Sequence, residues 1–272
     1  MKKFMVYKLA GIFIITALAL GAAARNPTEA SEMNGTSTED LRITDPDFFE
    51  IADYFTEQEV DGRNKILTPR QKELIKITSL ATQQSYELLK RETARALDMR
   101  LTPAEIKEAA LQCAPYAGLP RAADAQRANN ETLAERGVKL PLESRAAVNK
   151  ATRFEKGLDA QAALFGDGMR QIAKPGPGKI PPINYYLITN CFGDYYTRTG
   201  LDLETREMLT LVVLMNLGVE PQMMAHIRGN AGVGHGREFI AEMIYQCLPY
   251  MGYPRALNAL ACLEKVLPKA AE

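Results

Sequence analysis

The chain has 272 residues, of which 46% are hydrophobic and 24% are charged, with 33 basic and 33 acidic side chains and a formal net charge of +0. This composition provides for a buried core in one large or two small domains and is typical of soluble globular proteins. The charge balance gives no reason to expect a nucleic acid as a partner.

The first 24 residues, MKKFMVYKLAGIFIITALALGAAA, are typical of a secretory signal peptide. They begin with lysines, continue with an apolar run from Leu9 to Leu20 and end with Ala22 and Ala24, which suit an A-x-A cleavage site. The apolar run is shorter than the roughly 20 residues that a spanning helix needs. We therefore expect cleavage, export to the periplasm and no stable membrane insertion, with an uncleaved anchor as the weaker alternative.

Two later stretches are nearly the same: QCAPYAGLPRA at residues 112–122 and QCLPYMGYPRA at residues 246–256. They belong to a longer match, without a gap, between residues 67–127 and residues 201–261. The match exceeds what random pairing would give, so we infer an internal duplication. The shared P-Y-x-G-x-P-R predicts a corner that ends one helix and begins the next, because Gly suits a helix end and Pro a helix start. We interpret this corner as structural and not as a pair of active sites.

Each copy is predicted to be helical. Thr68 and Thr102 each precede a proline at the first helical position and an apolar pattern of helical period, and Glu105 completes a capping box with Thr102. In the second copy, Asp202 is the expected N-cap and Gly218 the expected helix end. No stretch of any length alternates as a strand would. The fold class predicted from the sequence is therefore all-α.

The copies set the expected domain organisation. Residues 25–44 are polar and expected to be disordered, residues 45–133 form a first, diverged domain, residues 134–154 are a linker, and residues 155–272 form a second domain. Within the second domain, an apolar and aromatic helix is expected over residues 183–200. No counterpart of that helix is expected ahead of the first copy.

Three segments of the second copy carry a resemblance to a known family: T-R-E at residues 205–207, the H-I-R-G segment that begins at His226, and the corner P-Y-x-G-x-P-R-A-L-N-A. Together they resemble the carboxymuconolactone decarboxylase family, which includes the alkylhydroperoxidase-D-like proteins. The first copy resembles a diverged domain of the same family. The resemblance implies two tandem helical domains packed as a pseudo-dimer, and a homo-oligomer formed as a trimer of such tandem chains.

The resemblance also implies a site. In active family members an acid from the T-R-E helix meets a histidine from the next helix, and here these residues are Glu207 and His226. A carboxylate beside an imidazole fixes its tautomer and makes a proton relay usable near neutral pH. The implied activity is decarboxylation or another proton transfer on a small cyclic or keto acid, with no metal or cofactor. Arg228 and Gln222 are the expected substrate-binding residues, although Arg228 points about 200° away from His226 on an ideal helix.

Other functions stay open. Peroxidase-type members carry C-x-x-C before the histidine, but Val219 and Gln222 occupy those positions here, so a peroxiredoxin-like redox activity is the less favoured alternative. In the first copy Glu92 stands at the histidine position, so this copy is expected to be silent or to depend on Glu73 and Glu92. The four cysteines permit disulfides in an oxidising compartment, but Cys113 and Cys247 lie in apolar helical patterns and are expected to be small buried side chains. A single-cysteine reductase that uses Cys191 or Cys262 is a further, less favoured alternative. A protein that binds a small organic molecule without turnover is the remaining alternative to a decarboxylase-like lyase.

Overall fold

The computed structural model describes residues 38–173 and 181–269, and every regular element in these two ranges is a helix. The expected signal peptide, residues 1–24, lies outside the described residues. Thr38–Thr44, at the end of a segment for which we expected disorder, forms helix α1. Within the described ranges, no helix is both long enough and apolar enough to cross a membrane. The all-α prediction is confirmed.

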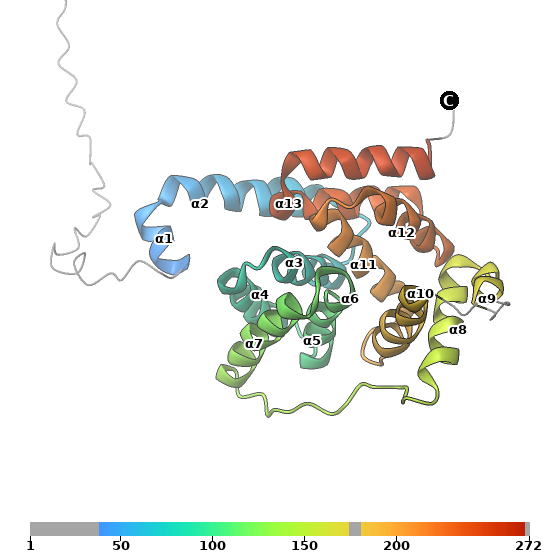
Figure 1. Ribbon diagram of the computed structural model, residues 1–272. Coiled ribbons are helices and arrows are strands. Elements are labelled where there is room, and N and C mark those ends of the chain that lie inside the picture. Colours follow the sequence, from blue (N-terminus) through green and yellow to red (C-terminus); the bar gives the residue numbers. More distant parts are fainter. Residues whose placement is uncertain (1–37, 174–180, 270–272) are drawn as a thin grey trace, which may run out of the picture. The chain divides into compact units, whose positions relative to one another are not determined.

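Figure 1 shows the order of the helices along the chain. The elements up to the end of the first copy are α1 (Thr38–Thr44), α2 (Pro46–Asp53), the π-helix η1 (Tyr54–Asp61), α3 (Pro69–Gln83), α4 (Tyr86–Asp98), α5 (Pro103–Leu111), α6 (Ala114–Ala117) and α7 (Leu119–Glu135). The elements after the linker are α8 (Arg153–Phe165), α9 (Gly168–Ile172), α10 (Pro182–Tyr186), the π-helix η2 (Leu187–Tyr196), α11 (Leu203–Leu217), α12 (Glu220–Gly232) and α13 (Arg237–Val266).

Side-chain caps begin the helices where the sequence predicts them. The Thr102 hydroxyl accepts from the Glu105 backbone N–H at 3.2 Å, and the Glu105 carboxylate accepts from the Thr102 backbone N–H at 2.7 Å. Thr68 forms the same reciprocal pair with Gln71 at the start of α3. Asp202 accepts from the backbone N–H of Thr205 at 2.8 Å. These bonds satisfy N–H groups that a helix start leaves unpaired, so each cap fixes where its helix begins.

Glycines with positive φ end helices at the predicted corners. Gly118 has φ 93° and separates α6 from α7, while Gly252 has φ 78° and breaks the helical path of α13. Gly218 has φ 73° and ends α11. The left-handed region is accessible to glycine at little cost, which explains why these residues occupy the turning points. The corners are confirmed as helix breaks.

The two copies share one hydrophobic core. α3 and α11 pack against each other and lie side by side in Figure 1. Both are buried around most of their circumference, as expected of central helices. Polar side chains also join them: Asn216 on α11 donates to the Ser79 hydroxyl at 3.1 Å and accepts from Gln83 at 3.1 Å. The copies therefore pack as a pseudo-dimer around paired central helices.

A π-helix precedes the central helix of each copy, η1 before α3 and η2 before α11. The expectation that the segment before the second copy has no counterpart is therefore wrong. η2 differs from η1 in packing closely against α8. A β-carbon on Gly157 of α8 would meet the carbonyl oxygen of Ile188, and one on Gly193 of η2 would meet that of Arg153. Glycine at both positions lets α8 and η2 pack with their backbones in contact.

Candidate functional site

Glu207 and His226 meet across α11 and α12. The Nδ1 atom of His226 lies 2.8 Å from Oε1 of Glu207. The Glu207 side chain is fully buried, and that of His226 is 9% exposed. The structure thus brings together the two residues that the sequence singles out as a proton-transfer pair.

Gly229 and Asn230 make this approach possible. Gly229 lies one turn after His226, and a β-carbon at this position would collide with Oε1 of Glu207. The side chain of Asn230 donates to the backbone carbonyl of Glu207 at 3.1 Å and to that of His226 at 2.8 Å. The Asn230 bonds therefore hold α12 against α11 beside Glu207 and His226, and Gly229 leaves space for the Glu207 carboxylate.

The second oxygen of Glu207 is also occupied. The Tyr196 hydroxyl, from η2, donates to Oε2 of Glu207 at 2.8 Å. A carboxylate that accepts at both oxygens leaves Nδ1 of His226 as the donor in the contact with Oε1. No hydrogen bond with a described residue engages Nε2 of His226, so this atom is available to a ligand. Neutral His226 therefore presents an acceptor at Nε2, and the protonated ring presents an acid there.

Tyr196 is the centre of a group of buried hydroxyls. Its oxygen lies 2.6 Å from Oγ1 of Thr210 and 3.1 Å from the hydroxyl of Tyr116. The Tyr196 hydroxyl is the donor toward both Glu207 and Thr210, so its one proton is shared between these acceptors and Tyr116 donates to Tyr196. Burial raises the pKa of Tyr196 and of Tyr116 well above the usual value, so both stay protonated as donors.

Two side chains of the first copy, Gln112 and Tyr116, form hydrogen bonds in this group. Gln112 donates from Nε2 to Thr210 at 3.1 Å and accepts at Oε1 from Arg206 at 3.0 Å. Tyr116 lies four residues further on, in the same Q-C-x-P-Y corner. The first corner therefore does more than turn the chain, since its Gln and Tyr side chains form hydrogen bonds with the second copy.

A buried ion pair fixes the orientation of Gln112. Arg206 is 1% exposed and donates to Glu108 at 2.8 Å, while Arg198 approaches the same carboxylate at 2.7 Å. Burial lowers the pKa of Arg206 despite its bond to Glu108, but an arginine stays charged at neutral pH. A buried charge of this kind is stabilised only when its donors are satisfied, so Arg206 holds both Glu108 and Gln112 in place.

Aromatic side chains enclose the imidazole. The ring centroids of Tyr116 and Phe165 lie 5.5 Å and 5.4 Å from that of His226, both edge to face. The rings of Tyr116 and Phe165 therefore restrict the directions from which a substrate can approach the imidazole.

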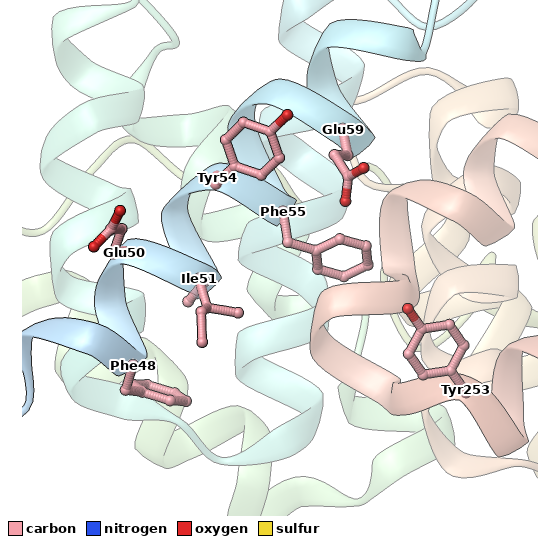
Figure 2. Close-up of a pocket in the computed structure, with 8 residues that line it drawn as sticks. Phe48, Glu50, Ile51, Tyr54, Phe55, Glu59 and Tyr253 are labelled. Carbon is pink, nitrogen blue, oxygen red and sulfur yellow. The ribbon is translucent and has the colours of Figure 1, made fainter.

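Three hollows of about 560, 540 and 190 Å³ lie elsewhere, and none of these three is lined by His226. Figure 2 shows the first of these hollows, where Ile51 and Phe55 point toward Tyr253 on α13.

The two expected substrate-binding residues lie outside this group. Arg228 is exposed, and its NH1 atom approaches the carbonyl oxygen of Met224 on its own helix at 3.4 Å. Gln222 is exposed as well. The structure does not bring either residue into hydrogen-bond contact with Glu207 or His226, and their roles stay predictions.

The cysteines are free thiols in buried positions. Burial raises the pKa of Cys113 to about 11 and the pKa values of Cys191 and Cys247 to about 12. Cys191 donates to the Tyr116 hydroxyl at 3.4 Å. Thiols of this kind are not thiolates at neutral pH, and the thiolate is the form that attacks peroxides and disulfides.

Comparison with known proteins agrees with this geometry. Residues 46–131 and residues 181–265 each match the carboxymuconolactone decarboxylase family. One relative, a 4-carboxymuconolactone decarboxylase from Acinetobacter baylyi, is 24% identical over 120 residues, which are 44% of this chain and 90% of the relative. An uncharacterized 15.0 kDa protein in the nqo9–nqo10 intergenic region of Paracoccus denitrificans is 32% identical over 89 residues, 32% of this chain and 66% of the relative. The chain belongs to the carboxymuconolactone decarboxylase family and carries two domains of that family in tandem.

Proposed function

We propose that the second copy catalyses decarboxylation, or a related proton transfer, on a small cyclic or keto acid, with His226 as the acid or base and Glu207 as its partner. The observation that carries this proposal is the buried contact of 2.8 Å between Nδ1 of His226 and Oε1 of Glu207, which leaves Nε2 available. The relative from Acinetobacter baylyi is named a 4-carboxymuconolactone decarboxylase, and that name favours a lactone carboxylic acid as substrate.

The pair suits the proton inventory of such a reaction. When a carboxylate leaves as carbon dioxide, the electron pair of the broken carbon–carbon bond enters the conjugated carbonyl system of the substrate. Protonated His226 then donates its Nε2 proton to the electron-rich carbon and becomes neutral. Glu207 stabilises the imidazolium before the transfer, and Tyr196 keeps the Glu207 carboxylate in position. A proton from water restores His226 for the next cycle.

Binding without turnover is the second candidate. It is favoured by the enclosure of His226 between Tyr116 and Phe165, which restricts access to Nε2. A thiol-based redox activity receives no support, because the raised pKa values of Cys113, Cys191 and Cys247 oppose thiolate formation.

A turnover screen separates these candidates. The protein, its His226→Ala variant and its Glu204→Gln variant are incubated with cyclic lactone acids and keto acids, and carbon dioxide release is measured. Glu204 is an exposed carboxylate one turn before Glu207 on α11, so its variant serves as a matched control. We expect His226→Ala to lose about 100-fold or more in rate, as loss of a general acid does, and Glu204→Gln to retain activity. Equal activity in wild type and His226→Ala, or no turnover of any compound, would contradict the proposal.

A further inference from the structure

The first copy holds a pair of carboxyl groups at the place of the catalytic pair. In the gap-free match between the copies, Glu73 stands where the second copy has Glu207, and Glu92 stands where it has His226. Glu73 is 1% exposed on α3, and Glu92 is 7% exposed on α4. Tyr250 occupies the same position in the second corner as Tyr116 in the first. It lines one hollow together with Glu92, as Tyr116 lies against His226 in the second copy.

These buried carboxyl groups lack hydrogen-bond donors. Among the described residues, Oε1 of Glu73 and Oε2 of Glu92 have no hydrogen-bond donor other than the carboxyl proton of the pair itself. Arg95 lies 3.7 Å from Glu73 and 3.8 Å from Glu92, and Arg91 lies 3.6 Å from Glu92, all too far for hydrogen bonds. A buried acceptor without a donor is costly, and native proteins rarely leave one unpaired. Part of this acceptor capacity is satisfied within the pair, because protonated Glu73 hydrogen-bonds to Glu92, and the remainder indicates a missing donor.

The two groups do not ionise together. Burial raises the pKa of Glu73 to about 8, and the Glu92 carboxylate adds to this effect, while Lys76 and Arg95 oppose it. At neutral pH the pair therefore holds one proton and one negative charge, as close carboxyl groups do. That proton forms a hydrogen bond between the two carboxyl groups. An N–H group of a ligand could take its place.

A hollow of about 190 Å³ opens onto Glu92, the outer member of this pair, and has the size of a small organic molecule, while Glu73 does not line it. Glu92 lines it together with the aromatic rings of Phe48 and Phe49 on α2 and Tyr250 on α13. Burial, with the nearby charges of Glu92, Asp61 and Glu73, raises the pKa of Tyr250 well above its usual value, so its ring stays neutral. Aromatic faces attract cations.

The other charges around the hollow are already paired or face solvent. Lys76 is bound to Asp61 at 2.6 Å, and Asp53 to Arg42 at 2.6 Å. Glu57 on η1 adds a further negative charge to the lining. The side chains of Arg91 and Arg95 are 39% and 43% exposed, so water screens them, whereas the oxygens of Glu73 and Glu92 without partners are buried. A cation that displaces the shared proton leaves the net charge of the site unchanged. An anion would instead be repelled by the Glu92 carboxylate.

We propose that the first copy is a second binding site, which takes a small organic ammonium ion with an apolar or aromatic body in the hollow and holds it at the carboxylate of Glu92, the partner of the buried Glu73. The ammonium N–H groups supply the donors that the carboxyl oxygens lack, and the rings of Phe48, Phe49 and Tyr250 surround the apolar body. The site is independent of the chemistry at His226.

Calorimetry with three probes of one shape tests the assignment. Benzylamine, benzyl alcohol and benzoate are titrated into the full chain at pH 6, 7 and 8, in buffers of different ionisation enthalpy. Benzylamine is expected to bind most tightly and to release a proton. Its affinity is expected to rise by up to about tenfold per pH unit over this range, because bound ligand and bound proton exclude each other. Tighter binding of benzoate, no benzylamine binding at millimolar concentration, or no proton release would overturn the proposal.

Variants locate the binding. Glu92→Gln removes the charge with little change in shape and is expected to weaken benzylamine binding about tenfold or more, since a charged hydrogen bond is lost. Glu73→Gln keeps a neutral side chain like the protonated carboxyl, and is expected to abolish the proton release. Glu87→Gln changes an exposed carboxylate on the same helix and is the matched control. His226→Ala is expected to bind benzylamine like wild type, and loss of binding in this variant would place the ligand in the second copy and overturn the proposal.

Discussion

Tyr116 and His226 meet edge to face, with their ring centroids 5.5 Å apart and their planes at 88°. Tyr116 belongs to the first copy of the duplication and His226 to the second. The same tyrosine reaches Tyr196, which in turn donates to Glu207. A side chain of the first copy therefore contacts the Glu207–His226 pair of the second copy, both directly and through Tyr196.

The Tyr116→Phe variant tests this dependence. It keeps the ring against His226 but removes the hydroxyl that contacts Tyr196 at 3.1 Å and Cys191 at 3.4 Å. We expect a loss of about 1 kcal/mol in the free energy of unfolding, and a fall in kcat because Tyr196 is held less firmly on Glu207. Steady-state kinetics and urea denaturation measure both effects. Tyr253→Phe, at an exposed tyrosine of the second corner, is the control. Unchanged kcat in Tyr116→Phe would show that the hydroxyl has no positioning role.

Gly229→Ala tests the close approach of the two helices. The new methyl group would occupy the space of the Glu207 carboxylate, which must then leave His226. We expect a loss of about 1–3 kcal/mol in stability from overpacking, together with loss of turnover. Gly168→Ala is the comparison, since nothing lies within 4 Å of a β-carbon there. If both variants behaved alike in thermal denaturation and turnover, Gly229 would not be the residue that admits the carboxylate.

The pH dependence of stability tests the protonation of Glu73. Burial and the Glu92 charge raise the pKa of Glu73 from 4.5 to about 8 in the folded protein. Between these values the native state holds a proton that the unfolded chain has lost, so the free energy of unfolding falls as pH rises. The expected fall between pH 5 and pH 8 is on the order of 1–3 kcal/mol. Urea denaturation at several pH values should show this fall in wild type and a flatter curve in Glu73→Gln. Parallel curves would contradict a shared proton at Glu73.

Thiol reactivity tests the absence of a redox-active cysteine. Cys113, Cys191, Cys247 and Cys262 are all buried, and burial raises the pKa of each thiol. We expect a chromogenic disulfide reagent at pH 7 to react slowly with the native protein and fully after unfolding in guanidinium chloride. Rapid labelling of a native cysteine, identified by mass spectrometry, would reopen the redox alternative.

The sequence allowed the prediction of local features that depend on few neighbours. The caps at Thr68, Thr102 and Asp202 need only a hydroxyl or carboxylate beside the first free N–H groups of a helix. The pairing of Glu207 with His226 was expected from a resemblance to a family whose members share this pair. These features therefore agree with the structure.

Contacts between the copies were not predictable in the same way. Gln112 and Tyr116 lie in a corner whose local sequence explains only the break between two helices. Their contacts with Thr210 and Tyr196 form only when the two copies pack together. The recurrence of Gln and Tyr in both corners was the available signal. Tyr196 was hidden for a similar reason, since it lies on a π-helix, where the helical period no longer indicates which side chains face the core.

The most direct test of the central claim is a double-mutant cycle on kcat/KM with His226→Ala, Glu207→Gln and the double variant. If Glu207 acts through His226, the double variant should be no slower than His226→Ala alone, because the partner has nothing left to orient. If the two losses multiply, Glu207 and His226 act independently. That result would contradict the proton-transfer pair.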